Sequence, residues 1–228
     1  MTVDRPRLDA PNLPALAAGC AAVGAGGGGD PDLALTMALR AVAEHGPVHV
    51  VGLDDIDDDA LVMPCGMVGA PTIADERVWS GDEGATLLDM VTRLHGRPVQ
   101  ALMPLQIGGA NGVLPVTWAA RLGLPLADAD GTGRAFPELQ QQAMHLGGVA
   151  AGPVVLTDGR GNTIVIHLGD DVWEDACCAR PPRARARPRR TACAARWRGV
   201  RRSAGPSRAK PGSEASGRPI SPVTLREG

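Results

Sequence analysis

Aromatic side chains are scarce in this chain. Its 228 residues include no Tyr, one Phe and four Trp, which is too few for the aromatic platforms that stack single-stranded nucleic acid. An uninterrupted run of about 18 apolar residues, the minimum for a membrane-spanning helix, is also missing. The first twelve residues, MTVDRPRLDAPN, hold acids and prolines where a secretory signal needs an apolar segment. We therefore expect no membrane association and a cytoplasmic location.

Cysteine and histidine do not occur in metal-binding spacings. The five cysteines include no C-x-x-C pair and their number is odd, which argues against a zinc site and against a disulfide framework. We interpret Cys65 as a core residue, and His145 and His167 as surface or core residues. A G-x-S-x-G motif and a P-loop lysine are missing as well, which argues against serine-hydrolase and P-loop chemistry. We expect no metal ion, and the cofactor stays unknown.

Positive and negative charge are separated along the chain. Residues 1–176 hold 9 Arg and 23 Asp or Glu, a net charge of −14, whereas residues 177–228 hold 13 Arg, 1 Lys and 2 Glu, a net charge of +12. Those last 52 residues contain only four Leu, Ile, Val or Phe residues, too few to bury a core. We therefore predict a flexible N-terminus over 1–14, a folded domain over 15–176 and a disordered Arg/Pro-rich tail over 177–228.

The tail has two interpretations. Its segment ARPPRARARPRR could bind nucleic acid or another acidic surface by neutralising phosphates. Alternatively, Arg, Ala, Pro and Gly are all encoded by GC-rich codons, so a GC-rich gene translated in a shifted frame would give this composition. We favour the frameshift, and expect nucleic-acid binding nowhere outside the tail.

Helix-like and strand-like segments alternate through the folded part. Asp30-Pro31 has the pattern of a helix N-cap followed by proline at the first position. We predict helices over 30–46, 80–96, 111–123 and 137–147, strands over 48–53, 60–69, 99–107 and 124–130, and a closing hairpin over 153–168. The alternation predicts the α/β class, with a mainly parallel sheet, flanking helices and a C-terminal β-hairpin.

Three glycine-bearing loops fall at junctions that lead into helices. They are GAGGGGDP at 24–31, QIGGAN at 106–111 and DADGTGRAFPE at 128–138. Because ligands bind at the carboxyl edge of parallel sheets, we expect these loops to converge on a ligand site.

The first loop satisfies G-x-G-x-x-G at Gly24, Gly26 and Gly29, with Asp54 near the end of the next strand, as in dinucleotide-binding proteins. However, Asp30 would place a carboxylate where a pyrophosphate takes the helix-terminal amides, with no basic residue nearby. The loop then either shapes a pocket for a small polar ligand or is a structural turn.

The third loop places Arg134 among the acids Asp128, Asp130 and Glu138. Arginine can clamp a carbonyl-type ligand, and a carboxylate can orient water or act as a general base. The alternative is a cluster of ion pairs at a helix start. In the second loop, the amides of Gln106 and Asn111 could hold a heterocycle, although Asn111 would equally suit a helix N-cap.

The motifs GAGGGGDP, VMPCGMVGAPT, WSGDE, PLQIGGANGVLP and DADGTGRAFPELQ occur in this order between about residues 15 and 175. In this order they resemble the bacterial and archaeal DUF917 family, which is associated with S-methyl thiohydantoin desulfurase and with hydantoinase/oxoprolinase-type enzymes. The resemblance implies an α/β first domain and a β-rich second domain. Here the basic tail stands in place of the second domain, so we expect a truncated enzyme, and whether it is active or inactive stays open.

From the resemblance we expect a domain that hydrolyses a C–S bond on a hydantoin-type ring. Water would attack with Asp130 or Glu138 as base, and Arg134 and loop amides would stabilise the developing charge. The candidate substrate-binding residues are Gly26, Gly27, Gly28, Gly29, Asp30, Gln106, Gly108, Gly109, Asn111 and Asp128.

Two other functions stay open at this point. The first is a non-catalytic ligand-binding subunit that works with a hydantoinase/oxoprolinase-like partner or as a homo-oligomer. The second is a dinucleotide-dependent oxidoreductase that uses the first glycine loop.

Overall fold

Four parallel strands form the centre of the sheet. The computed structural model describes residues 7–25, 27–69, 79–136, 138, 141–146, 153–158, 160–167 and 191–194. Its central strands lie in the order β2 (Val48–Val51), β5 (Leu126–Ala127), β4 (Ala101–Pro104) and β3 (Val62–Val68). All three contacts between neighbours in this group are parallel.

Antiparallel strands extend this sheet at both ends. β1 (Arg7–Leu8) pairs with β2, and on the other side β8 (Thr191–Ala194) pairs with β3. Beyond β8 lies the hairpin of β6 (Val154–Thr157) and β7 (Thr163–Ile166). The predicted α/β class, with a mainly parallel sheet and a closing hairpin, is confirmed.

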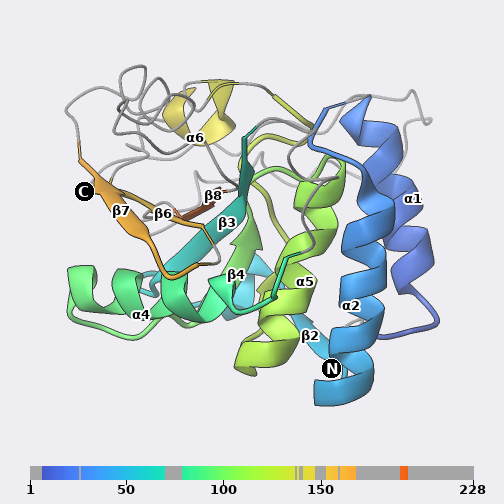
Figure 1. Cartoon of the computed structure of the whole chain (residues 1–228), viewed down its shortest axis with the longest axis horizontal. Coiled ribbons are helices and arrows are strands. Elements are labelled where there is room, and N and C mark those ends of the chain that lie inside the picture. The colour runs from blue at the N-terminus through green and yellow to red at the C-terminus, as the bar shows by residue number, and fades with distance from the viewer. Residues whose placement is uncertain are drawn as a thin grey trace, which may run out of the picture.

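Four longer helices pack on one face of the sheet. α1 (Leu13–Gly24), α2 (Pro31–His45) and α5 (Ala110–Leu122) stand side by side, and α4 (Glu83–His95) lies beside β6 (Figure 1). The crossovers from β3 through α4 to β4 and through α5 to β5 therefore run over the same face, as repeated right-handed βαβ units do. None of the described helices has the length and apolarity of a membrane span.

Alternate strand residues separate two buried clusters, as the two-residue period of a strand requires. Met63 and Leu102 face the helices, whereas Val62, Ala101 and Met103 belong to a second cluster on the other face. The second cluster includes Met144 of the short helix α6 (Ala143–Leu146). The helix face thus carries the larger core.

Helix α5 is the central helix of the fold. Every residue from Ala110 to Ala120 is buried, and Trp118 is only 1% exposed. At Gly84 of α4, an added Cβ would lie 2.5 Å from Cγ of Trp118. The close contact between α4 and α5 therefore requires glycine at this position.

Several predicted helix boundaries are confirmed. The Asp30 side chain accepts a hydrogen bond of 2.9 Å from the Asp32 amide, as an N-cap should. Gly46 and Gly96 end their helices, with N–H groups donating to the carbonyls of Val42 and Thr92.

Other boundaries differ from the prediction. Pro137, where we predicted the fourth helix to begin, lies outside the described residues; α6 begins at Ala143 and has four residues. The structure also places β1 and the start of α1 within residues 1–14, where we expected a flexible segment. The segment of α1 is rich in alanine and glycine, so it lacks the apolar periodicity that would have predicted a helix.

The tail contributes strand β8 to the sheet. We predicted no ordered element there. The other residues of 177–228 lie outside the described residues, so the disorder of the tail stays a prediction.

Candidate functional site

The three glycine loops converge, and they do so through backbone contact. The amides of Ala110 and Asn111 donate to the carbonyls of Gly29 and Gly28, at 3.0 and 3.2 Å. An added Cβ on Gly28 would lie 2.0 Å from the Gly108 carbonyl oxygen. An added Cβ on Gly108 would lie 2.6 Å from the Ala135 amide nitrogen, so no side chain fits between the loops.

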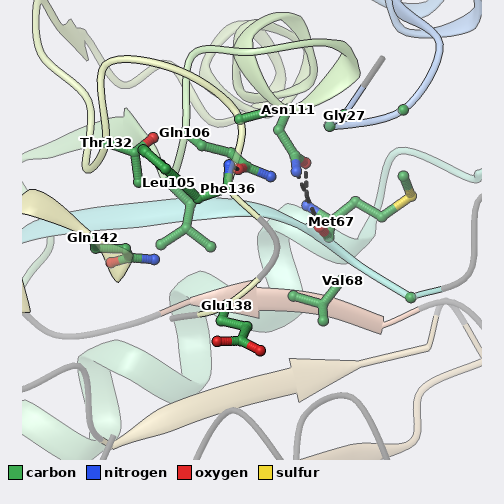
Figure 2. Close-up of a pocket in the computed structure, with 14 residues that line it drawn as sticks. Gly27, Met67, Val68, Leu105, Gln106, Asn111, Thr132, Phe136, Glu138 and Gln142 are labelled. Carbon is green, nitrogen blue, oxygen red and sulfur yellow. Dashed lines mark hydrogen bonds between the residues drawn. The ribbon is translucent and has the colours of Figure 1, made fainter. Parts of the chain in front are cut away.

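A cavity of about 350 Å³ lies where these loops meet the end of β3 (Figure 2). It is at the carboxyl ends of β3 and β4, the usual ligand edge of a parallel sheet. Its described lining residues are Gly27, Gly28, Gly29, Met67, Val68, Gly69, Leu105, Gln106, Asn111, Thr132, Ala135, Phe136, Glu138 and Gln142.

About half of the predicted site residues line this cavity. They are Gly27, Gly28, Gly29, Gln106, Asn111 and Glu138. The described candidates that do not line it are Asp30, Gly108, Gly109, Asp128, Asp130 and Arg134. Gly26 lies outside the described residues.

The Asp130 carboxylate forms hydrogen bonds with backbone amides and a hydroxyl of the second and third loops. Its Oδ2 accepts hydrogen bonds from the amides of Ile107 (2.9 Å), Thr132 (3.2 Å) and Gly133 (2.8 Å), and from the Thr132 hydroxyl (3.3 Å). This carboxylate therefore ties the second loop to the third. Asp130 is not among the described residues that line the cavity, and its role as a general base stays a prediction.

Arg134 is not among the described residues that line this cavity. Its side chain is exposed, and its guanidinium carbon lies 5.5 Å from the ring centroid of Phe136. Asp128 is exposed as well. Asp128 and Arg134 therefore lie on the outer surface of the third loop.

The first glycine loop is used for packing. Asp30 caps α2, and the carbonyls of Gly28 and Gly29 satisfy the first amides of α5. At the N-terminus of α2, the Asp32 amide is thus occupied by the Asp30 carboxylate, whose charge would also repel a pyrophosphate. This arrangement favours the structural-turn interpretation of the loop over dinucleotide binding.

Asn111 joins α5 to the end of β3. Its Oδ1 accepts from the Met67 amide at 2.5 Å, and its Nδ2 donates to the Met67 carbonyl at 3.1 Å (Figure 2). The side chain is 2% exposed and lies inside α5, whose N-cap is Gly109. Asn111 therefore supplies the strand end with the hydrogen bonds of a neighbouring peptide, and the alternative that it caps the helix is wrong.

Gln106 presents its amide nitrogen to the cavity. Its Oε1 accepts from the Phe136 amide at 2.9 Å, which fixes the orientation of the carboxamide because only the oxygen can accept. The Nε2 group donates to none of the described residues. Gln106 is thus an oriented hydrogen-bond donor in the lining.

Glu138 is the one ionisable side chain among the described lining residues. It is exposed, and its Oε2 accepts from Nε2 of Gln141 at 3.3 Å. In the view of Figure 2 it lies below Gln106 and Asn111. Of the three predicted catalytic residues, Glu138 alone lines the cavity.

The buried cysteines are not nucleophiles. Burial and, secondarily, the charge of Asp130 raise the pKa of Cys20 to about 11, and burial raises the pKa of the Cys65 thiol further. Both thiols are therefore protonated at neutral pH. Within the described part of the chain, no group of three or more His, Cys, Asp and Glu residues could hold a metal ion.

Several lining residues were not predicted from the sequence. Met67 and Val68 end β3, and Leu105 directly follows β4, so the prediction of these strands could have placed them at the ligand edge. Gln142 had no signal in the sequence, because it follows a loop whose path only the structure gives.

The comparisons with known proteins agree with this fold. Residues 11–168 match the family described as S-Me-THD-like, N-terminal domain. No curated protein matches. A crystal structure of a protein from Chromobacterium violaceum is 24% identical with a TM-score of 0.69 and shares the fold.

That match covers 83% of this chain and 54% of the other, so the chain spans about half the length of the solved structure. The family match covers well over half of this chain and includes all three glycine loops. The chain therefore belongs to the S-Me-THD-like family, of which it contains the N-terminal domain.

Proposed function

We propose that this domain binds the substrate of an enzyme that hydrolyses the C–S bond of an S-methyl thiohydantoin-type ring. The observation that supports this is the chemistry of the cavity lining, which combines carboxamides and apolar side chains with a single carboxylate. Such a lining suits a small neutral ring that carries N–H and C=O groups and an apolar methylthio group.

Glu138 is the general base in this proposal. It removes a proton from a water molecule while the water oxygen attacks the ring carbon that bears sulfur. The C–S bond then breaks, and methanethiolate leaves. Glu138 returns its proton to the thiolate, and the second water proton ends on the ring nitrogen. The products are methanethiol and a ring with C=O in place of C–SCH₃, with no oxidation or reduction.

Gln106 stabilises the charge that develops during the attack. As the C=N bond of the ring opens, negative charge grows on nitrogen. The Nε2 group of Gln106 is held towards the cavity by the bond from the Phe136 amide to Oε1. A donor that is already oriented stabilises such charge without reorganisation.

The test is methanethiol release from an S-methyl thiohydantoin by the full chain and by its Glu138→Gln variant. We expect the variant to lose about 10²–10⁴-fold in rate, the usual contribution of a general base, and to keep its affinity for hydantoin. Asp128→Asn removes an exposed carboxylate outside the cavity and is the matched control, with unchanged rate. Equal rates for wild type and Glu138→Gln would contradict the role of Glu138.

A ligand-binding subunit is the second candidate function. It is favoured by the positions of Asp130 and Arg134, which are not among the described residues that line the cavity. In that case the chain works with a hydantoinase/oxoprolinase-like partner. Hydantoin binding without methanethiol release would favour this function over hydrolysis.

A further inference from the structure

A largely buried carboxamide lies in the cavity lining. Gln142 is 4% exposed and lines the cavity. Its side chain makes no hydrogen bond to the described residues, and its amide atoms are not among those that are fully enclosed without a partner. The amide therefore reaches the cavity, where a ligand can take the place of water as its hydrogen-bond partner.

The backbone around Gln142 is firmly held. The amide of Ala143 donates to the carbonyl of Gly131 at 2.9 Å, and Met144 is 6% exposed in the second core cluster. An added Cβ on Gly131 would lie 2.5 Å from the Leu105 carbonyl oxygen, so this turn fits closely against β4. The placement of Gln142 therefore follows from the packing of the two residues after it.

The side chain extends into the space that the other lining residues surround. Figure 2 shows the amide end of Gln142 directed towards the middle of the view, between Leu105 and Glu138. A carboxamide offers two N–H donors and one C=O acceptor. It can therefore pair in two places with a ligand that has an N–H group beside a C=O group.

We infer that Gln142 is a specificity-determining residue that binds the N–H and C=O groups of a neutral cyclic amide or ureide. The inference rests on the cavity of the proposed function, although it does not depend on hydrolysis. It makes Gln142 the residue that recognises the ring edge, while Gln106 and Glu138 serve the reacting carbon. A site with a buried amide should reject an analogue that leaves this amide unpaired.

The experiment measures the affinity of the full chain for hydantoin and for 1,3-dimethylhydantoin, which has no N–H group. Wild type should bind hydantoin about tenfold more tightly, the effect of about 1.4 kcal/mol on a dissociation constant. Gln142→Leu should lose this preference through weaker hydantoin binding, with 1,3-dimethylhydantoin unaffected. Gln100→Leu, at an exposed glutamine just before β4, is the matched control and should keep the preference.

Thermal unfolding separates this role from a structural one. Without ligand, Gln142→Leu should unfold at the wild-type midpoint or above it, because the replaced amide had no partner among the described residues. Gln142→Met, which has nearly the same shape, serves as a second variant with the same expected loss of preference. Unchanged hydantoin affinity in both variants would overturn the inference, as would a wild type that does not distinguish the two rings.

Methanethiol release from the same preparations distinguishes the two proposals. If hydantoin binding depends on Gln142 but no variant releases methanethiol, the inference stands and the hydrolytic function fails. If wild type and Gln142→Leu release methanethiol with equal KM, the function stands and the inference fails. Binding of neither ring, together with no release, overturns both.

Discussion

Two carboxylates of the same loop, Asp130 and Glu138, have opposite surroundings. Asp130 accepts hydrogen bonds from three backbone amides and a hydroxyl, whereas Glu138 is exposed and lines the cavity. The Asp130 carboxylate holds the second and third loops together, whereas the Glu138 carboxylate borders the cavity.

The structural role of Asp130 gives a prediction. Asp130→Ala should lower the free energy of unfolding by about 2–3 kcal/mol, the range for hydrogen bonds to a charged group, because the second and third loops lose their link. Urea unfolding measures this change. Asp128→Ala removes an exposed acid two residues away and should change stability by no more than about 0.5 kcal/mol. Equal effects of the two substitutions would show that the link through Asp130 does not stabilise the fold.

From the sequence, candidate site residues were predicted in the loops that meet at the cavity. The sequence did not separate residues that line the cavity from residues that bind backbone amides. Glu138, Gln106 and Asn111 were predicted at the site and line the cavity. Asp130 and Arg134 were predicted there and are outside it. Spacing along a loop says which residues are near one another, but the direction of each side chain depends on which backbone amides come within reach.

At the scale of elements, α5 positions the site. Its first amides bind the glycine loop, Asn111 binds the end of β3, and its buried middle packs against α2 and α4. The closeness of α4 and α5 depends on Gly84, which leaves room for Trp118.

Two helical glycines allow a matched test of this contact. Gly84→Ala should lower the free energy of unfolding by about 1–3 kcal/mol, because the new methyl group overpacks against Trp118. Gly19→Ala in α1 should instead raise it by up to about 1 kcal/mol, since alanine favours a helix, and an added Cβ there would have no neighbour within 4 Å. Thermal or urea unfolding compares the two variants. A stabilising effect of Gly84→Ala would contradict the close packing of α4 on α5.

For the whole molecule, β8 joins the β6–β7 hairpin to the rest of the sheet. β8 lies between β3 and β6 and pairs with both. Removal of residues 177–228 should lower the thermal midpoint by about 4–8 °C, equivalent to about 2 kcal/mol for a chain of this size, because β3 and the β6–β7 hairpin lose their shared neighbour.

A shorter deletion is the control for this prediction. Removal of residues 195–228 keeps β8 and takes away a segment with only four Leu, Ile, Val or Phe residues, so the midpoint should stay within about 1 °C. Scanning calorimetry of the three chains gives the comparison. If both deletions leave the midpoint unchanged, the whole tail is dispensable, as its composition alone predicts.

The sequence by itself determined the α/β class, the order of the main strands and helices, the N-cap at Asp30 and the three loops that meet. These follow from local signals, namely apolar periodicity, capping residues and glycines, which act over a few neighbouring residues. Tertiary structure alone decided that α1 forms, that Asp130 binds backbone amides and that Gln142 reaches the cavity. Each of these depends on contacts between segments far apart in the chain, such as Ile107 with Asp130 and Gly131 with Ala143. Such contacts result from tertiary packing, which local sequence patterns do not predict.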